Sequence, residues 1–224
     1  MRPVVAIDGP AGAGKSSVSR ALAARLGFTY IDSGAMYRAV GVLAHEQGVP
    51  FDDDAELARL VDALRFEATP DGTGLAVNGR DLSDTIRRAD AGDLASRVST
   101  RPVVRERLVA LQRRLGEGGG VVMEGRDIGT VVFPDAQVKV FLVADPRERA
   151  HRRAAELRAR GEAVDEAAMA TDIAARDQRD QSRAVAPLRP APDAVTIDTT
   201  PLSLPEVVER LVALVHERTA GGPV

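Results

Sequence analysis

The chain has 224 residues, 44% hydrophobic and 28% charged, which suits one large globular domain or a core with an insertion. A formal net charge of −3 argues against a general nucleic-acid binder, because such proteins are basic. The sequence has no run of about 18 apolar residues and begins with a strand pattern, so we expect neither a membrane span nor a signal peptide. The absence of cysteine excludes disulfides and thiolate metal sites, and it is consistent with the cytoplasm.

Short apolar runs rich in β-branched residues alternate with helical patterns along most of the chain. Because turn residues bound these runs, they indicate buried parallel strands of an α/β fold. The runs are Pro3–Ile7, Phe28–Ile31, Gly120–Met123, Val138–Val143 and Ala194–Ile197. Capping-box spacing indicates that helices begin at Asp53 with Glu56 and at Ser203 with Glu206, and Pro102 indicates the start of another helix. Helices are expected to end at Gly27, at Gly48 and before Gly116.

The first motif is a phosphate-binding loop. Residues 9–16, GPAGAGKS, match the pattern G-x-x-x-x-G-K-[S/T] between a strand pattern and a helical pattern. Its glycines let successive N–H groups point inward, and the following helix adds its positive end. Lys15 supplies a compact charge for phosphates, and Ser16 supplies a hydroxyl for Mg²⁺. Lys15 is one of only two lysines among 30 basic residues, the other being Lys139, so a specific role is favoured.

The stretch DSGAMYR, residues 32–38, follows the second apolar run. Ligands of parallel sheets bind at the carboxyl ends of strands, where Ser33 is expected to cap the next helix with Arg38 one turn inside it. An ordinary helix start with a surface arginine explains this stretch equally well.

Residues 65–82 differ from the rest of the chain because they alternate in period two. With the turn signals Asp71-Gly72 and Asn78-Gly79, they indicate an antiparallel hairpin or meander. Helical patterns flank this segment, so residues 33–100 are interpreted as an inserted subdomain. Residues 1–32 and 101–224 would form the α/β core.

Two later stretches concentrate charge. Glu124, Arg126 and Asp127 lie among glycines in MEGRDIG, at the end of the third apolar run, where a functional loop is favoured. The arginine-rich stretch 147–160 reads as a helix before Gly161 and indicates a lid over phosphates at about 147–165. An exposed basic helix explains it as well, and His151 is interpreted as a surface or packing residue.

The stretch AARDQRDQSRA, residues 174–184, carries the most informative charge pattern. At about 100° per residue, one face collects Arg176, Arg179, Asp180 and Arg183, and it continues the line of Met169 and Ile173. A solvated stripe would lie opposite the large apolar residues, so these charges are predicted to face the protein body. Desolvated arginine–aspartate sets are costly unless they pair with each other or with a ligand, which favours a binding site.

Together these motifs resemble those of the bacterial cytidylate kinases, a branch of the nucleoside monophosphate kinases. The matching stretches are IDGPAGAGKSS, DSGAMYR, EGRDIGTVVFPDA, RERAHRR and RDQRDQSRAVAPL, in the family's order and spacing. The resemblance implies a P-loop NTPase three-layer fold with a five-stranded parallel sheet. It also implies an inserted monophosphate-binding subdomain with a small antiparallel sheet, a short helical lid, and ATP-dependent phosphorylation of CMP and dCMP in pyrimidine metabolism.

The resemblance assigns roles at the matching positions. ATP would contact Gly9, Pro10, Ala11, Gly12, Ala13, Gly14, Lys15, Ser16 and Ser17, with Arg149 and Arg153 as lid contacts and Mg²⁺ on Ser16. The CMP phosphate would be held by Ser33, Arg38, Arg126 and Arg183. The cytosine would face Ser96, Arg105 and Asp127, and the ribose would meet Arg176 and Asp180. Lys15, Arg126 and Arg183 would be catalytic, and Arg179 receives no ligand.

Two other classes stay open, namely another P-loop small-molecule or nucleoside monophosphate kinase and a non-catalytic nucleotide-binding module. A GTPase is disfavoured because the only asparagine, Asn78, is followed by glycine rather than lysine, and the Asp-x-x-Gly at 71–74 lies in the hairpin segment. The expected partners are ATP with CMP or dCMP, without nucleic acid or membrane, and the expected state is a monomer in the cytoplasm.

Overall fold

The computed structural model describes residues 2–68, 75–88, 90–159, 161–183 and 185–220. The chain forms two compact units, which we call the core unit (Met1–Ile31 with Leu115–Val224) and the inserted unit (Asp32–Arg114). The inserted unit contains the segment 33–100 and continues through most of the helix that follows it.

The core unit is built on a five-stranded parallel sheet in the order β2-β6-β1-β7-β8. Its strands are β1 (Val4–Asp8), β2 (Thr29–Asp32), β6 (Val121–Gly125), β7 (Val138–Val143) and β8 (Val195–Asp198). Each coincides with a predicted apolar run to within two residues, so the predicted sheet is confirmed. The central strand β1 places Val5 between Val122 of β6 and Val138 of β7. Strands covered on both faces read as continuous apolar runs, which is why the pattern was visible in the sequence.

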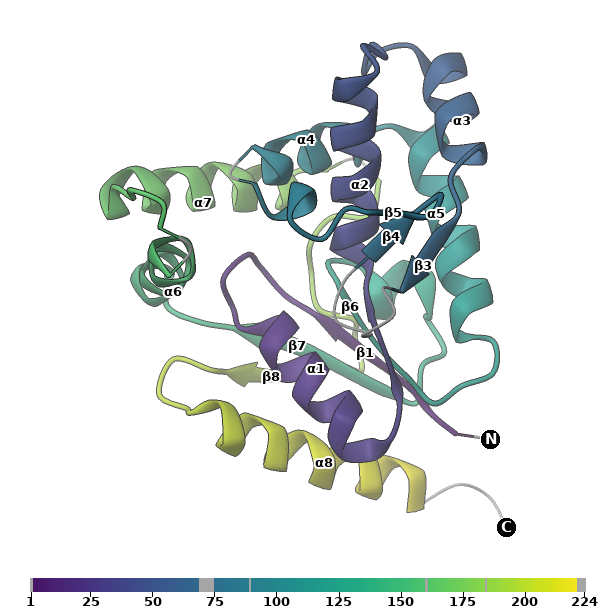
Figure 1. Ribbon diagram of the computed structural model, residues 1–224. Coiled ribbons are helices and arrows are strands. Elements are labelled where there is room, and N and C mark those ends of the chain that lie inside the picture. Colours follow the sequence, from purple (N-terminus) through teal and green to yellow (C-terminus); the bar gives the residue numbers. More distant parts are fainter. Residues whose placement is uncertain (1, 69–74, 89, 160, 184, 221–224) are drawn as a thin grey trace. The chain divides into compact units, whose positions relative to one another are not determined.

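In the described part of the core unit, the sheet is accompanied by a short π-helix (Ile128–Val132) and four α-helices, namely α1 (Lys15–Leu26), α6 (Pro146–Arg158), α7 (Glu166–Gln181) and α8 (Leu204–Ala220). In Figure 1, α1 and α8 lie side by side along the sheet, and their Leu22 and Leu211 are fully buried in one cluster with Ile7. The predicted caps hold, since Gly27 ends α1 with φ 64° and the Ser203 N–H donates to Glu206 at 2.8 Å before α8. The helices α6 and α7 pack against each other.

Outside residues 69–74 and 89, which are not described, the inserted unit contains four α-helices and the small sheet. These are α2 (Ser33–Glu46), α3 (Asp54–Asp62), α4 (Ala91–Val98) and α5 (Pro102–Gly116), with a short 3₁₀ turn at Thr85–Arg87. The sheet is antiparallel, in the order β3 (Phe66–Ala68), β4 (Leu75–Val77) and β5 (Arg80–Asp81). Asn78 and Gly79 both have positive φ, 52° and 76°, as a tight hairpin turn requires, which confirms that turn prediction. The Asp71-Gly72 turn and the 71–74 match lie outside the described residues.

Helix ends in the inserted unit differ in detail from the prediction. Asp32, rather than Ser33, caps α2 by accepting a hydrogen bond from the Ala35 N–H at 2.8 Å. Asp32 lies one residue before the helix with an extended backbone, and this is the position from which a side-chain oxygen can accept from the free N–H groups of the first turn. Asp53 caps α3 as predicted. At Gly41, a Cβ would lie 2.7 Å from the Leu94 carbonyl carbon, so the close approach of α2 and α4 requires glycine. Within the described ranges, no helix is both long and apolar enough to cross a membrane.

Candidate active site

The predicted phosphate loop connects β1 to α1, as the motif requires. A side chain at Gly9 would meet the Leu142 carbonyl oxygen at 2.1 Å, and one at Gly12 would meet the Arg149 carbonyl oxygen at 2.8 Å. Gly14 adopts a left-handed conformation directly before α1. The glycines therefore bring the backbone close to its surroundings, and the loop opens onto the N–H groups at the start of a helix, where anions bind.

Lys15 is buried directly beneath this loop, with 6% of its surface exposed, and its ammonium donates a hydrogen bond to the Pro10 carbonyl oxygen at 2.7 Å. Burial and, to a smaller extent, the positive charge of Arg126 lower the pKa of Lys15 to about 7, against the opposing effect of Glu124. A negatively charged ligand beside the ammonium would favour its charged form. The position and charge of Lys15 thus suit a phosphate group.

Asp8, the last residue of β1, is a site residue that the sequence reasoning missed. Its carboxylate is 4% exposed and accepts hydrogen bonds from the N–H groups of Ile128 and Gly129, each at 2.8 Å. Burial raises the pKa of Asp8 to about 6, although these two N–H groups lower it. An acidic residue ending an otherwise apolar central strand was the signal available in the sequence.

The predicted functional loop begins at the end of β6, next to β1, where Gly125 pairs with Asp8. The buried Glu124 accepts a hydrogen bond from the Tyr30 hydroxyl at 2.5 Å. Arg126 follows and directs its Nε to Asp180 of α7 at 3.1 Å. The parallel pairing of β1 and β6 therefore brings this charged loop to the same edge of the sheet as the phosphate loop.

Asp180 is the centre of an arginine cluster in the core unit, and only 1% of its surface is exposed. Its carboxylate accepts hydrogen bonds from Arg126 and, at its other oxygen, from Arg183. Burial opposes ionisation, but the charges of Arg126, Arg183 and Arg176 outweigh it and hold the pKa of Asp180 below its usual value. Three arginines from the loop after β6 and from α7 and its end thus act on one buried carboxylate, a composition suited to binding an anion.

The prediction that Arg179 faces the protein body is wrong. Arg179 is exposed, and Asp177 is buried together with Ile173 and Asp180. The reason is geometric, because Arg179 lies about 120° around the helix from Ile173 at about 100° per residue, whereas Asp177 lies about 40° away. The face was correctly predicted for the other residues of α7, but its centre was placed too far toward Arg179.

Arg149 of α6 is not an exposed lid residue. It is buried and donates to the Ala11 carbonyl oxygen at 3.0 Å and to Asp177 at 2.5 Å, so it ties α6 and α7 to the phosphate loop. Arg153 instead pairs with Glu156 on the same helix at 2.9 Å. Arg152, which the sequence reasoning did not single out, donates to the Thr199 carbonyl oxygen at 2.9 Å. Its guanidinium lies beside Gly14, where a Cβ would be 3.8 Å from Nη1.

The predicted residues of the inserted unit lie on α2, α4 and α5. Arg38 pairs with Asp32 at 2.8 Å across the first turn of α2, where Ser33 is buried. The guanidinium of Arg105, also buried, lies 6.0 Å from the centre of the Tyr37 ring. Ser96 is buried on α4. The nucleotide-binding roles of these residues stay predictions.

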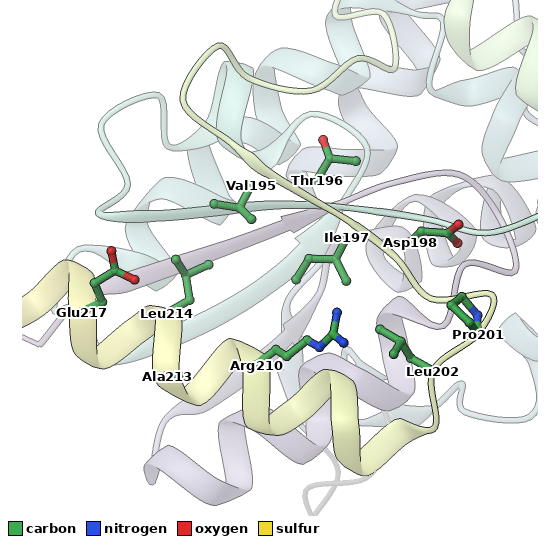
Figure 2. Close-up of a pocket in the computed structure, with 10 residues that line it drawn as sticks. All are labelled: Val195, Thr196, Ile197, Asp198, Pro201, Leu202, Arg210, Ala213, Leu214 and Glu217. Carbon is green, nitrogen blue, oxygen red and sulfur yellow. The ribbon is translucent and has the colours of Figure 1, made fainter.

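Two further features lie apart from these residues. Lys139, the second lysine, has a structural use, since its buried ammonium pairs with Asp193 at 2.9 Å. An open groove of about 640 Å³ lies between the edge strand β8 and α8, and Figure 2 shows Ile197 on the side of β8 that faces Arg210 of α8. The groove is lined by Val195, Thr196, Ile197, Asp198, Pro201, Leu202, Arg210, Ala213, Leu214 and Glu217. None of these is a predicted site residue, so the groove does not define the candidate site.

Similarity to known proteins extends over nearly the whole chain. A family model described as "Cytidylate kinase" matches residues 5–217. A cytidylate kinase of Geobacter sp. (strain M21) is 50% identical over 221 residues, 98% of this chain and 95% of that protein. One from Pelotomaculum thermopropionicum is 50% identical over 216 residues, 95% of this chain and 96% of that protein. A bifunctional pantoate ligase/cytidylate kinase of Synechocystis is 47% identical over 224 residues, 98% of this chain but 44% of that longer protein.

Solved structures with low sequence identity share the fold alone. A protein from Thermus thermophilus superposes with a TM-score of 0.50 at 19% identity, over 97% of this chain and 98% of that one. An uncharacterized protein from Eubacterium ventriosum gives a TM-score of 0.51 at 12% identity, over 96% and 98% of the two chains. The family assignment therefore rests on the sequence comparisons, which agree with the phosphate loop and the arginine cluster. The chain belongs to the cytidylate kinase family.

Proposed function

We propose that the chain transfers the terminal phosphate of ATP to CMP, and also to dCMP, forming diphosphates for pyrimidine nucleotide metabolism. The observation that carries the proposal is the cluster of the partly buried Arg126 and Arg183 around the buried Asp180, in the same unit as the phosphate loop. A kinase whose acceptor is itself a phosphate needs cationic groups for a second anion in addition to those that hold ATP.

The donor side of the proposal uses residues Gly9 to Ser17. Their backbone N–H groups would hold the ATP phosphates, and Lys15 would contact the β- and γ-phosphates. Mg²⁺ bound with ATP would neutralise phosphate charge, and the hydroxyl of the exposed residue Ser16 would hold it. No cluster of three or more potential metal ligands occurs among the described residues. Mg²⁺ that arrives on the phosphates needs none, because it keeps several waters and takes few protein ligands.

The acceptor side uses the arginine cluster. Arg126 and Arg183 would hold the CMP phosphate, since guanidinium forks bind phosphate oxygens in pairs and offset the repulsion between two anionic substrates. Arg176 and Asp180 would contact the ribose, which is feasible because each carboxylate oxygen accepts more than one hydrogen bond. The acceptor oxygen is already ionised at neutral pH, so the protein supplies position and charge rather than a general base.

The remaining predicted contacts belong to the same proposal. Asp127 of the core unit and Ser96 and Arg105 of the inserted unit would recognise cytosine, with Ser33 and Arg38 as further phosphate contacts. Arg149 is proposed to act on ATP by shaping the phosphate loop, because it holds the Ala11 carbonyl oxygen. Arg153 is retained as a lid contact. A cytoplasmic location is supported by the cysteine-free sequence, and the expected monomer is checked by light scattering.

A coupled assay of ADP release tests the function. With ATP and Mg²⁺ constant, we expect turnover with CMP, turnover with dCMP, little with UMP, and none with AMP, GMP or shikimate. Turnover with AMP or shikimate but not CMP would indicate a different P-loop kinase. ATP binding without turnover for any acceptor would indicate a nucleotide-binding module that is not an enzyme.

A further inference from the structure

Asp8 joins the two loops that the proposed reaction uses. It ends β1, and the phosphate loop begins at the next residue, Gly9. Its two carboxylate oxygens accept hydrogen bonds from consecutive N–H groups, Oδ1 from Ile128 and Oδ2 from Gly129, both at 2.8 Å. These N–H groups follow Arg126 and Asp127 directly. One side chain thus connects the start of the donor loop with the loop that carries proposed acceptor contacts.

Burial and close packing around Asp8 restrict the groups that form these two hydrogen bonds. Asp8 and Ile128 are buried, and a buried carboxylate is costly unless its oxygens are hydrogen-bonded. Gly129 is confined as well, since a Cβ there would lie 3.3 Å from Cγ and Cδ of Lys139 and 3.5 Å from Oδ2 of Asp8. The backbone at Ile128 and Gly129, which begins the π-helix after Asp127, therefore has little room to move without breaking one of the two hydrogen bonds.

We infer that Asp8 is a positioning residue, which fixes the loop carrying Arg126 and Asp127 against the start of the phosphate loop. The inference rests on the proposed function, in which those loops hold the acceptor and the donor. Asp8 itself touches neither substrate in this scheme. Its effect reaches the reaction through Arg126, whose Nε must meet Asp180 for the arginine cluster to form.

Asp8→Asn is the most informative substitution because it preserves shape. The amide oxygen accepts one of the two N–H groups, but the NH₂ group then faces the other N–H, so one hydrogen bond is lost and two donors are opposed. The loop is expected to shift while the strand and the glycines of the phosphate loop keep their places. Misplacement of a binding group by about 1 Å can reduce turnover by about 100-fold.

The test compares the two substrates in wild type and Asp8→Asn, well below the melting temperature of both. We expect kcat/KM for CMP to fall about 10- to 100-fold while the equilibrium Kd for ATP changes less than about threefold. Hydrogen exchange at the amides of Ile128 and Gly129 should accelerate in the variant. A purely structural role would lower the melting temperature without separating the CMP and ATP parameters.

Two further variants control the experiment. Gly129→Ala disturbs the same contact from its other partner and should give the same CMP-selective loss, which keeps the test decisive if Asp8→Asn does not fold. Asp53→Asn is the matched control, since Asp53 also accepts two backbone N–H groups, those of Ala55 and Glu56 at 3.0 Å, but at the start of α3. It should leave the kinetics of both substrates unchanged.

The outcomes separate the inference from the proposed function. If wild type shows no CMP-dependent turnover, the proposed function fails, and exchange at Ile128 and Gly129 still decides whether Asp8 fixes the loop. If wild type is active, the inference is overturned by unchanged exchange in Asp8→Asn, by equal losses for CMP and ATP, or by no kinetic change in either loop variant.

Discussion

Replacing Asp180 by asparagine should destabilise the core unit through its arginines. Asp180 is 1% exposed and accepts hydrogen bonds from Arg126 and Arg183, whose side chains are 18% and 9% exposed. The substitution keeps the shape of the side chain and removes its charge. The two guanidinium groups then lose the carboxylate that compensates their burial, which is the costly way to break a buried ion pair.

The magnitude follows from the burial of the partners. Removing one member of a buried pair costs about 3–5 kcal/mol, and the partial exposure of Arg126 favours the lower part of that range. For a chain of this size about 1 kcal/mol corresponds to about 2–4 °C in melting temperature, so the lower part of the range, about 3–4 kcal/mol, predicts a fall of about 6–16 °C at pH 7. The folded-state pKa of Asp180 is lowered, so its contribution is present above the unfolded value of 3.8 and is lost on acidification. The two proteins should therefore converge at low pH.

Thermal unfolding followed by circular dichroism, with and without inorganic phosphate, measures the effect. Phosphate should raise the melting temperature of Asp180→Asn more than that of wild type, because the anion replaces part of the missing negative charge. Asp172→Asn, an exposed position on the same helix, is the control and should remain within about 0.5 kcal/mol of wild type. A melting temperature for Asp180→Asn equal to that of the control, or an identical phosphate response in wild type, would refute the reasoning.

Three other predictions concern the reaction and its pH dependence. Lys15→Ala should abolish phosphate transfer in the ADP-release assay, because no other lysine lies at the phosphate loop; activity near that of wild type would exclude its proposed role. Arg183→Ala should lower kcat/KM for CMP by about 2–4 kcal/mol of transition-state stabilisation with little change in ATP affinity, whereas equal losses would place Arg183 on the donor side. The raised pKa of Asp8 means that the protonated side chain stabilises the fold below the unfolded value of 3.8 and that this stabilisation, about 3 kcal/mol, is lost as pH rises through about 6. Between pH 4 and pH 7 the free energy of unfolding of wild type should therefore decrease relative to that of Asp8→Asn. If the two free energies changed in parallel with pH, the raised pKa of Asp8 would be contradicted.

The same titration affects the proposed kinetics in the opposite sense. Below about pH 6 a protonated Asp8 accepts only one of its two N–H groups well, so kcat/KM for CMP should decrease in wild type. The CMP phosphate titrates in the same range. The ratio of wild type to Asp8→Asn at each pH isolates the contribution of Asp8, since the substrate is common to both.

The strands and the phosphate loop were predictable because their signals are local. Val138–Val143 reads as a strand from six consecutive residues, and GPAGAGKS carries its own conformational requirements at Gly9, Gly12 and Gly14. The charged face of α7 was predictable in part, since helical periodicity depends only on spacing. Its exact centre depends on what the helix packs against, and for this reason Arg179 was misplaced and Asp177 was missed.

The α/β class, the phosphate loop and the charged stretches of the candidate site follow from local patterns of amino acids. Which of these charged side chains contact one another depends on the folding of the whole chain, because the partners are far apart in the sequence. Asp8 and Ile128 are 120 residues apart, and Arg126 and Asp180 are 54 apart. No local sequence pattern links positions so far apart. The parallel pairing of β1 with β6 brings Asp8 close to Ile128, and the contact of α7 with the loop after β6 brings Asp180 to Arg126.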